Sequence, residues 1–403
     1  MNIFKKTYCR IFQLGFKIVY PFLPYREPKI LNSIDDLPKI LNDLSINRVL
    51  LITGKNVRGL NLTKHLEELL ERSHITCNVF DKTNQNPTVL NVEEARNIYM
   101  KEQCQALIAF GGGSPIDCAK AVGARITYPK KNLDKLKGLL KVTKKIPPLF
   151  AIPTTAGTGS EVTLASVITD SEKQHKYTLM DFTLIPRFAV LDPTVTYSLP
   201  PHLTATTGMD ALTHAVEAYI GKSNTKETRS KAIKAIKLIF ENIEKAYNEP
   251  TNYEARKNML EASYLAGIAF SKSYVGYIHA IAHSIGGKYN TPHGLANATI
   301  MPIVLRQYGS SIYQKLHRLS VEIGISKKDE NIKESSNKFI KMIEHLNDQF
   351  NIPKYFDFIK EEDIALMAKH ADKEANPLYP VPKLMDKAEL KELYYIIGNL
   401  KNL

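Results

Sequence analysis

The fold is decided by the stretch Ala106-Leu-Ile-Ala-Phe-Gly-Gly-Gly-Ser-Pro-Ile-Asp117. Its first five residues are apolar, which is typical of a strand that is buried on both faces. Three glycines then turn the chain, and Pro115 follows at a position where the first turn of a helix accepts proline. The stretch therefore predicts a strand, a glycine turn and a helix, which together form the local unit of an α/β fold.

Similar units flank this stretch, because apolar runs and helical patterns alternate from about residue 46 to residue 200. We expect further strands at 48–53, 77–80 and 149–152, and helices at 62–72, 92–103 and 116–123. Strands that alternate with helices indicate a parallel sheet covered by helices.

After about residue 200 the strand signals fade and helical patterns follow one another. We expect helices at 204–220, 228–247, 253–271, 274–286 and 296–308. We therefore divide the chain into an N-terminal arm at 1–30, an α/β domain at 31–195 and an all-helical domain at 196–403. A length of 403 residues fits two lobes.

The composition is that of an ordinary globular chain with a basic surface. Hydrophobic residues make up 44%, charged residues make up 24%, and the net charge is +13. The lysines are scattered and no zinc-finger or RNA-binding signature accompanies them, so we expect no nucleic-acid partner. Cys9, Cys77, Cys104 and Cys118 form no CxxC pair, which fits reduced thiols and a cytoplasmic location.

The first thirty residues superficially resemble a signal peptide. Basic residues precede an apolar stretch at 11–23, but Lys17, Pro21 and Pro24 interrupt it, and no small-residue cleavage site follows. The stretch is also too short to span a bilayer. We therefore expect a docked amphipathic arm and no membrane partner.

Two glycine-containing loops follow expected strands and are candidates for binding phosphate. Gly111-Gly-Gly-Ser114 opens a helix, where backbone N–H groups carry partial positive charge and glycine permits close approach. Pro153-Thr-Thr-Ala-Gly-Thr-Gly-Ser-Glu-Val-Thr163 adds hydroxyl groups that suit phosphate and ribose. A tight turn and a helix N-cap are the structural alternatives. The GxGxxG fingerprint is absent, so this is not the common Rossmann pattern.

Four histidines and an aspartate occur in the helical half at matched spacing. Asp210 and His214 are four residues apart, and so are His279 and His283, so each pair lies on one helix face. His293 follows on an expected turn. Mixed imidazole and carboxylate ligands suit iron or zinc. A single histidine is more often a satisfied core residue, but burying so many titratable groups without a metal or substrate is costly. The spacing leaves open which three histidines bind.

Taken in order, these segments resemble the iron-containing alcohol dehydrogenase family. The resemblance is carried by residues 86–88, 111–117, 153–161, 208–214, 279–283, 291–294 and 374–382, and it runs from about residue 30 to the end. It implies an α/β N-terminal dinucleotide-binding domain plus an all-α C-terminal domain, with a cleft between them that holds the metal.

The resemblance also implies roles for individual residues. It makes Asp210, His214, His279 and His293 the ligands of Fe²⁺ (or Zn²⁺). His283 would lie beside the metal and share the catalytic role with Asp210, and Phe270 would line the substrate cleft. The cofactor would be held at its pyrophosphate by Gly112, Gly113, Ser114 and Asp117, at its ribose and nicotinamide by Thr154, Thr155, Thr158 and Thr163, and nearby by Lys176.

One position bears on the choice of cofactor. Many family members place an aspartate after the first strand, where it holds the adenosine ribose and excludes a 2′-phosphate. This chain has Gly54 there, followed by Lys55 and Arg58. Because loss of the acidic residue beside cations admits NADP, we expect NADP(H) to be favoured over NAD(H).

The resemblance implies a metal-dependent oxidoreductase that transfers a hydride between NAD(P)(H) and a primary alcohol or aldehyde, and we expect a homodimer. The alternative is a dehydroquinate synthase-like or glycerol dehydrogenase-like enzyme of the same superfamily. The synthase usually carries a glutamate where Asp210 stands, which counts against it. A catalytically silent scaffold protein predicts degraded ligands, and all four are intact.

Overall fold

The computed structural model describes residues 1–19, 22–171 and 175–401, and the chain forms two compact units. The α/β unit comprises Pro24–Pro200 and Glu249–Gly267. The helical unit comprises Met1–Leu23, Pro201–Asn248 and Ile268–Leu403.

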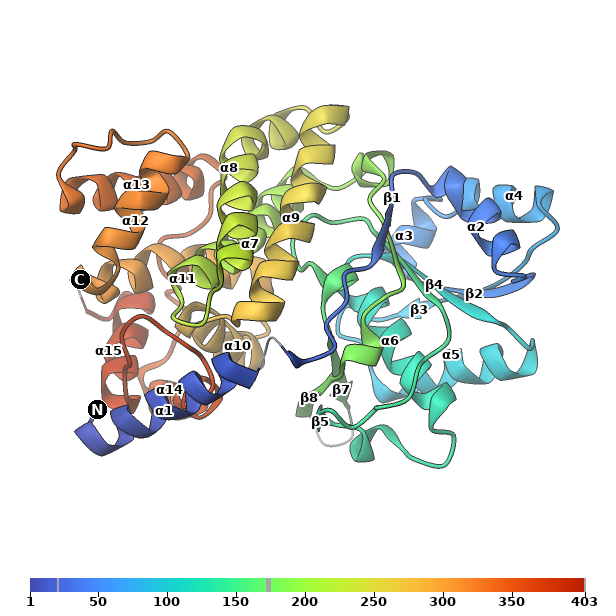
Figure 1. The fold of residues 1–403 in the computed structure, drawn as a ribbon, viewed down its shortest axis with the longest axis horizontal. Coiled ribbons are helices and arrows are strands. Elements are labelled where there is room, and N and C mark those ends of the chain that lie inside the picture. The colour runs from blue at the N-terminus through green and yellow to red at the C-terminus, as the bar shows by residue number, and fades with distance from the viewer. Residues whose placement is uncertain (20–21, 172–174, 402–403) are drawn as a thin grey trace. The chain divides into compact units, whose positions relative to one another are not determined.

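A six-stranded parallel sheet forms the centre of the α/β unit (Figure 1). Its strands run in the order β1-β9-β6-β4-β2-β3. Their bounds are β1 (Lys29–Leu31), β2 (Arg48–Gly54), β3 (Thr76–Thr83), β4 (Ala106–Gly111), β6 (Leu149–Pro153) and β9 (Phe188–Val190). The four strands expected from the sequence are confirmed as β2, β3, β4 and β6, and their parallel pairing is confirmed as well.

Both faces of the central strands are buried, which explains why β4 and β6 are continuously apolar. In β2, Leu50 and Ile52 pack into one hydrophobic cluster, whereas Val49 and Leu51 pack into the other. The first cluster is closed by α5 (Val89–Lys101) and α6 (Gly113–Thr127), and the second by α2 (Leu37–Asp43) and α4 (Lys64–Arg72). Helices therefore cover the two faces of the sheet, as the alternating pattern predicted.

A second, three-stranded sheet was not expected from the sequence. It consists of β5 (Gly138–Leu139), β8 (His175–Met180) and β7 (Ala165–Asp170), of which β7 and β8 pair antiparallel. The strands β1 and β9 of the main sheet were not expected either. With two or three residues each, β1, β5 and β9 are too short to show a period of two.

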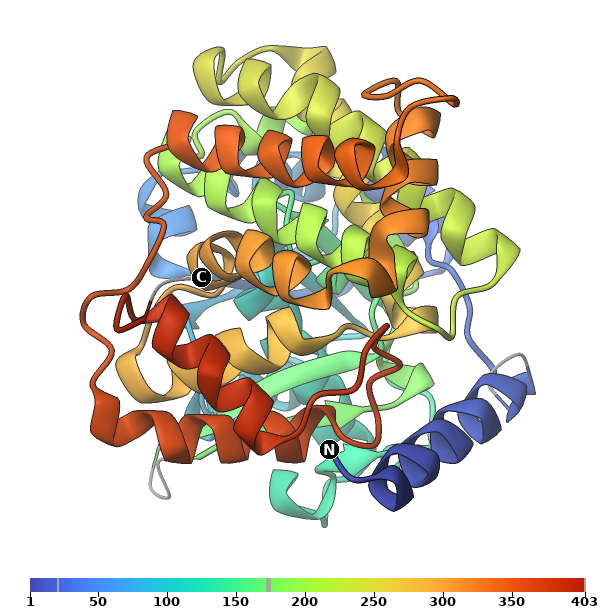
Figure 2. The same cartoon turned by 90° about the vertical axis from the view of Figure 1, so that its left-hand side faces the viewer.

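All of the helices expected after residue 200 are present, and the all-α character of the helical unit is confirmed (Figures 1 and 2). Its helices begin with α1 (Ile3–Val19) and continue with α7 (Pro201–Ile220), α8 (Lys226–Asn248), α9 (Tyr253–Ser273), α10 (Tyr277–Tyr289), α11 (His293–Tyr308), α12 (Ser310–Glu322), α13 (Ile332–Gln349), α14 (Glu361–Ala375) and α15 (Lys387–Ile397). The first fifteen residues of α9 belong to the α/β unit.

The first part of α9 belongs to the α/β unit because two glycines allow a loop of that unit to pack closely against it. Gly159 has a left-handed φ of +59°, and a Cβ on it would lie 2.8 Å from the Gly267 Cα. A Cβ on Gly267 would in turn lie 2.4 Å from Val162. The loop after β6 therefore packs directly on the α9 backbone.

Within the described part of the chain, no helix has the length and apolar character needed to cross a membrane.

Candidate metal centre and nucleotide loops

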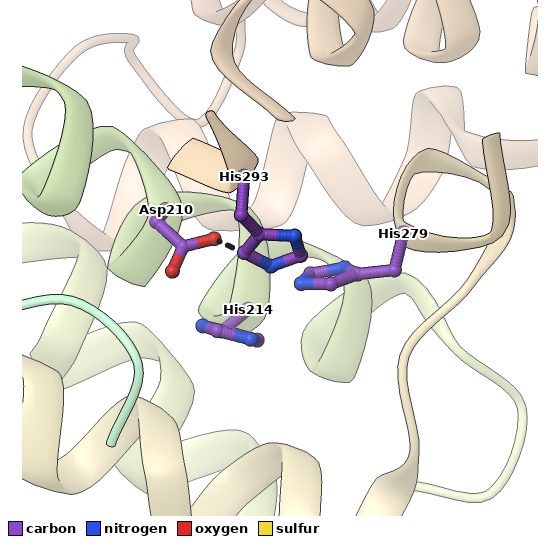
Figure 3. Close-up of side chains that lie close together, drawn as sticks. All are labelled: Asp210, His214, His279 and His293. Carbon is purple, nitrogen blue, oxygen red and sulfur yellow. Dashed lines mark ion pairs between the residues drawn. The ribbon is translucent and has the colours of Figure 1, made fainter. Parts of the chain in front are cut away.

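Four predicted ligands converge inside the helical unit (Figure 3). Asp210 and His214 project from one face of α7, His279 comes from α10, and His293 is the first residue of α11. One ligand atom from each of these residues lies within 4.8 Å of all the others. The geometry thus separates three histidines from the fourth, a choice that spacing alone could not make.

The four side chains form a compact aromatic and charged cluster. The rings of His214 and His279 stack with centroids 4.4 Å apart, and the His279 and His293 centroids are 5.4 Å apart. His293 Nε2 lies 3.3 Å from Asp210 Oδ1. Asp210, His214 and His279 are buried, whereas the His293 side chain is 38% exposed. One side of the cluster is therefore open to a small molecule.

The cluster fits a divalent metal ion in spacing and in protonation state. Ligand atoms on one cation lie no more than about 4.2 Å apart, which is twice a bond length of about 2.1 Å. In the observed group the ligand atoms lie within 4.8 Å of one another, about 0.6 Å beyond that spacing. Burial, together with the neighbouring histidines, lowers the pKa of His279 well below its usual value and the pKa of His293 to about 4. Both imidazoles are neutral at neutral pH, as metal ligands must be.

Glu217 holds the ring of His279 from behind. Its Oε2 lies 2.7 Å from His279 Nδ1 and also accepts a hydrogen bond from the Gly276 N–H, and its Oε1 accepts one from the Ile278 N–H. A carboxylate that accepts from Nδ1–H leaves Nε2 unprotonated for a metal, and this is a usual arrangement behind metal-bound histidine. Burial raises the pKa of Glu217, whereas the backbone N–H groups of Gly276, Ile278 and His279 lower it and favour the ionised carboxylate.

His283 lies next to the four-ligand group without belonging to it. Its ring stacks on His293 with centroids 5.2 Å apart, and its Nδ1 lies 2.7 Å from Glu374 Oε1. Glu374 also accepts a hydrogen bond from the Tyr379 hydroxyl. Burial alone would lower the pKa of His283, but the charge and hydrogen bond of Glu374 outweigh it and raise this pKa. Its side chain is 44% exposed, so this imidazole can exchange protons with water.

Two more side chains complete the surroundings of the centre. Phe270 of α9, expected to line a substrate site, stacks on His214 with centroids 4.1 Å apart. Asn297 of α11 is fully buried, and its Nδ2 donates to Asp210 Oδ1 over 2.6 Å. The same nitrogen lies 3.1 Å from His293 Nε2 and 3.2 Å from His279 Nε2. This amide therefore orients the aspartate within the group of ligands.

In the α/β unit, the phosphate-binding candidates lie at the point where the sheet reverses its strand order. The chain moves from β2 outward to β3, then returns to the other side of β2 as β4 and continues to β6. Gly54 ends β2 and Gly111 ends β4, so both lie at the carboxyl edge beside this reversal. Open parallel sheets bind ligands in the crevice at such a point.

The two predicted loops lie side by side at this edge. Gly111 pairs with Pro153 in the β4–β6 register, so both loops leave neighbouring strands together. A Cβ on Gly112 would lie 3.3 Å from Thr155 Oγ1, and one on Gly113 would lie 3.1 Å from Thr158. Helix α6 begins at Gly113 and presents its first N–H groups here. Glycine backbone, hydroxyls and a helix N-terminus are a combination that suits phosphate.

Two of the expected cofactor residues, Asp117 and Thr163, form contacts that stabilise the loop. Asp117 accepts hydrogen bonds from Ser160 Oγ (2.8 Å) and from the Val167 N–H (3.0 Å). Thr163 Oγ1 accepts one from the Nζ of Lys120 over 2.9 Å, and Lys120 is fully buried. Burial lowers the pKa of Lys120 to about 8. These bonds fasten α6 to the loop after β6.

The remaining expected cofactor residues are spread around the same edge. Thr154 is buried, and its N–H donates to the Gly111 carbonyl. Ser114 Oγ donates to the Gln85 carbonyl, and Lys176 Nζ donates to Asn86 Oδ1 over 3.0 Å. The segment at 85–88 therefore lies beside the glycine loop. This position explains why the motif at 86–88 occurs together with the motif at 111–117.

Sequence reasoning missed several residues that support the metal centre. Glu217 is three residues after His214, and Asn297 is four residues after His293, so helical spacing places each on its ligand's face. This spacing is the sequence signal that could have indicated Glu217 and Asn297. Glu374, by contrast, is 91 residues from His283, and no local pattern links the two.

The chemistry of these two sites defines the class of protein as a metal-dependent enzyme that works with a dinucleotide. A cluster of three imidazoles and one carboxylate suits a Lewis-acidic cation. The paired loops at the reversal of strand order suit a nucleotide.

Comparison with known proteins gives the family. Residues 31–193 match the family model described as "Iron-containing alcohol dehydrogenase", and residues 204–397 match "Fe-containing alcohol dehydrogenase family, C-terminal". The 1,3-propanediol dehydrogenase of Citrobacter freundii is 35% identical over 94% of this chain and 98% of its own. The NAD-dependent methanol dehydrogenase of Bacillus methanolicus is 34% identical over 84% of this chain and 89% of its own. The crystal structure of a 1,3-propanediol oxidoreductase superposes with a TM-score of 0.88, at 33% identity, over 92% of this chain and 98% of that one.

The chain therefore belongs to the iron-containing alcohol dehydrogenase family. It is a metal-dependent alcohol oxidoreductase, and the dehydroquinate synthase-like alternative is not favoured. The family resemblance inferred from the sequence motifs is confirmed.

Proposed function

We propose that the protein transfers a hydride between NADP(H) and a primary alcohol or aldehyde, with one Fe²⁺ (or Zn²⁺) held by Asp210, His214, His279 and His293. The observation that carries this proposal is the convergence of these four residues from three helices within 4.8 Å. The second support is the histidine–carboxylate pair of His279 and Glu217 behind them.

When bound, the cation supplies Lewis acidity toward the oxygen of the alcohol or aldehyde. The chain's own residues then account for the proton. Glu374 accepts from Nδ1 of His283, so Nδ1 holds a proton and Nε2 is left to accept one. Because His283 is partly exposed, it can pass that proton to water. Phe270 provides an apolar surface beside His214 that suits the carbon chain of a substrate.

The preference for NADP(H) rests on the end of β2. Gly54 offers no carboxylate to the adenosine ribose, and Lys55 follows it at an exposed position. Arg58 contributes less than its charge indicates, because its guanidinium is paired with Glu67 and donates to Thr63. Lys55 is therefore the cation that we assign to a 2′-phosphate.

We further propose that residues 31–195 act as the dinucleotide-binding domain and residues 196–403 as the metal-binding domain. Gly112, Gly113, Ser114, Thr154, Thr155 and Thr158 would hold the cofactor directly, Lys176 would lie close to it, and Asp117 and Thr163 would hold the loop. A cytoplasmic homodimer completes the proposal, and light scattering should give about twice the 45.4 kDa chain mass.

The main test combines metal analysis with a screen of short alcohols and aldehydes for NADPH oxidation or NADP⁺ reduction. The His279→Ala variant should lose both bound metal and activity, whereas His283→Ala should keep metal and lose about 10²- to 10⁴-fold in turnover. His345→Ala, at an exposed position of α13, is the matched control and should change neither. Full activity in His279→Ala would refute the ligand assignment.

The cofactor preference has its own test in Gly54→Asp. The backbone at Gly54 has an ordinary φ of −108°, and a Cβ would lie 3.2 Å from the Thr83 carbonyl oxygen, so an aspartate fits with a small adjustment. Its charge should repel a 2′-phosphate and accept from a ribose hydroxyl. We expect kcat/KM to favour NADPH in the wild type and to shift at least tenfold toward NADH in the variant. A tenfold preference of the wild type for NADH would reject the NADP assignment.

A further inference from the structure

Helix α1 is attached to the helical unit by its polar side. The Arg10 guanidinium donates to the carbonyl oxygens of Val381 (2.8 Å) and Pro382 (3.0 Å). The Gln13 amide donates to the carbonyl oxygens of Pro377 (3.0 Å) and Tyr379 (2.8 Å), and Gln13 is buried. Figures 1 and 2 show the helix along the edge of this unit, and its N-terminal end lies near α14 and α15, where Met1 pairs with Asp386 and Lys5 pairs with Asp372. This attachment fixes which way the helix faces.

The apolar side of α1 consequently faces outward. Six large hydrophobic side chains on it have exposed fractions between 58% and 83%, and they are Ile3, Phe4, Tyr8, Ile11, Leu14 and Ile18. Their spacing of three and four residues places them on one continuous face, opposite the buried Cys9 and Gln13. Proteins that remain fully in water rarely leave such a contiguous apolar surface uncovered.

Cations line the boundary between this apolar face and the attached side. The helix carries Lys5, Lys6, Arg10 and Lys17 and has no acidic residue. Beside it lies a pocket of about 530 Å³ whose lining includes the cations Lys6, Arg10 and Lys383. Ile11, Leu14 and Leu384 form the apolar part of the same lining. Among the described residues that line this pocket there is no carboxylate.

We propose that α1 binds the surface of a membrane containing anionic phospholipids, lying in its plane without spanning it. The apolar face enters the boundary between head groups and acyl chains, and the cationic pocket takes a lipid phosphate. A strongly amphipathic helix with a basic polar side is the kind of element that binds in this way. Anionic lipids also attract basic segments near the surface, which complements the chain's net charge of +13.

Charge also argues against a second copy of this chain as the partner. Two copies joined symmetrically through α1 would bring together two surfaces that each carry Lys6, Arg10 and Lys383, and so two surfaces of the same charge. A phospholipid surface has the opposite charge. Residues 1–30 lie outside the ranges matched by the family models. The inference departs from the expectation that the chain has no membrane partner.

The test is flotation of the full chain with vesicles of phosphatidylcholine alone and with vesicles that also contain phosphatidylglycerol. The wild type should float with the anionic vesicles, and this binding should weaken as salt is raised. Ile11→Glu should lower the partition onto anionic vesicles about tenfold or more. Leu90→Glu on α5 is the matched control, since Leu90 and Ile11 are both 65% exposed, and it should bind as the wild type does.

A second variant tests the pocket separately from the apolar face. Lys6→Gln combined with Lys383→Gln should reduce binding to anionic vesicles toward the level seen with phosphatidylcholine alone. Helix content and alcohol oxidation should be unchanged in all variants, because these positions are remote from the metal ligands in the chain and lie at the surface or at the pocket. Absence of wild-type binding to anionic vesicles, or equal binding by Ile11→Glu, would overturn the proposal. So would a fall in assembled mass for Ile11→Glu in sedimentation, which would assign this face to a second copy.

Discussion

At the scale of single residues, the metal centre depends on Glu217, which touches no substrate position and orients one ligand. Its two oxygens accept from Gly276, Ile278 and His279, so both oxygens are held by donors. A Cβ on Gly276 would lie 2.7 Å from Glu217 Oε1, so glycine is required there for the approach of the carboxylate. The arrangement fixes the His279 tautomer as well as its position.

Glu217→Gln should therefore weaken metal binding while leaving all four ligands in place. The glutamine side chain has one acceptor oxygen. Its NH₂ group therefore faces an N–H group from which the carboxylate accepted a hydrogen bond, and that bond is lost. We expect the Kd for Zn²⁺, measured by calorimetry on the chelator-treated protein, to rise about 10- to 100-fold. Glu241→Gln on α8, an exposed partner of Lys237, is the control and should leave the Kd unchanged. An unaltered Kd in Glu217→Gln would show that the carboxylate does not orient the ligand.

Some residues of the metal centre could be predicted from the sequence, and others could not. Asp210, His214, His279 and His283 could be recognised as candidates because their spacing and apolar surroundings are local properties of two helices, but the spacing did not show which three histidines bind. Glu217 and Asn297 were open to the same argument, since each shares a helix face with a ligand. Glu374 was beyond it, because its contact with His283 arises only when α14 packs against α10.

At the scale of elements, the position of His293 is set by how closely two helices approach. Gly294 follows it at the start of α11, and a Cβ on Gly294 would lie 2.4 Å from the Thr206 carbonyl oxygen of α7. The same Cβ would lie 3.5 Å from the Cβ of Asp210. The first turn of α11 therefore packs on the α7 backbone, which brings His293 to Asp210.

Gly294→Ala should push these two helices apart and separate the ligands that they carry. Overpacking of this kind typically costs about 1–3 kcal/mol in unfolding free energy. We also expect at least a tenfold weaker Kd for Zn²⁺. Gly287→Ala in α10 is the control, since a Cβ there meets no atom within 4 Å and alanine favours a helix by roughly 0.5–1 kcal/mol. Equal thermal unfolding of the two variants would contradict the close-approach argument.

The loop after β6 makes a prediction about pH. Glu161 is buried, and burial raises its pKa from an unfolded value near 4.5 to about 7. Between these values the folded chain holds a proton that the unfolded chain has released, so the unfolding free energy falls as pH rises from about 5 to 7. The neighbouring Lys120, with its pKa lowered to about 8, titrates in a higher window and with the opposite sign.

Glu161→Gln should remove this part of the pH dependence. In urea unfolding at pH 5, 6 and 7, the wild type should lose about 1–3 kcal/mol more than the variant across the range. The difference between the two proteins isolates Glu161 from the other titrating groups. Parallel pH profiles would mean that the buried carboxyl keeps its ordinary pKa.

The elements themselves were predictable where they are long and regular. β2, β4 and β6 contain apolar runs of four or five residues, and α7 to α11 are helices of 13 to 23 residues. β1 and β9 owe their pairing to the main sheet, because three residues define no pattern. The close contact of Gly159 with Gly267, 108 residues apart, likewise depends on tertiary packing that local propensity does not encode.

At the scale of the whole molecule, the two units carry two different binding chemistries. All four metal ligands come from α7, α10 and α11 of the helical unit. The glycine and threonine loops belong entirely to the α/β unit. The sequence pattern could separate a half with alternating strands and helices from an all-helical half. It could not show where the N-terminal helix attaches, because Arg10 and Gln13 donate to backbone carbonyl groups of residues 377–382.

This separation predicts that metal and nucleotide protect different parts of the chain in hydrogen exchange. Zn²⁺ at a hundred times its Kd adds about 2.7 kcal/mol to the state that binds it. Its protection should be greatest at 201–220 and 277–308, which hold the ligands, and chelation should reverse it. NADP⁺ should instead protect 111–127 and 153–163, and His279→Ala should abolish only the metal effect. A ligand stabilises most the segments that its own contacts hold together. If either ligand protected the metal-binding segments and the nucleotide-binding segments equally, the two sites would not be carried by separate units.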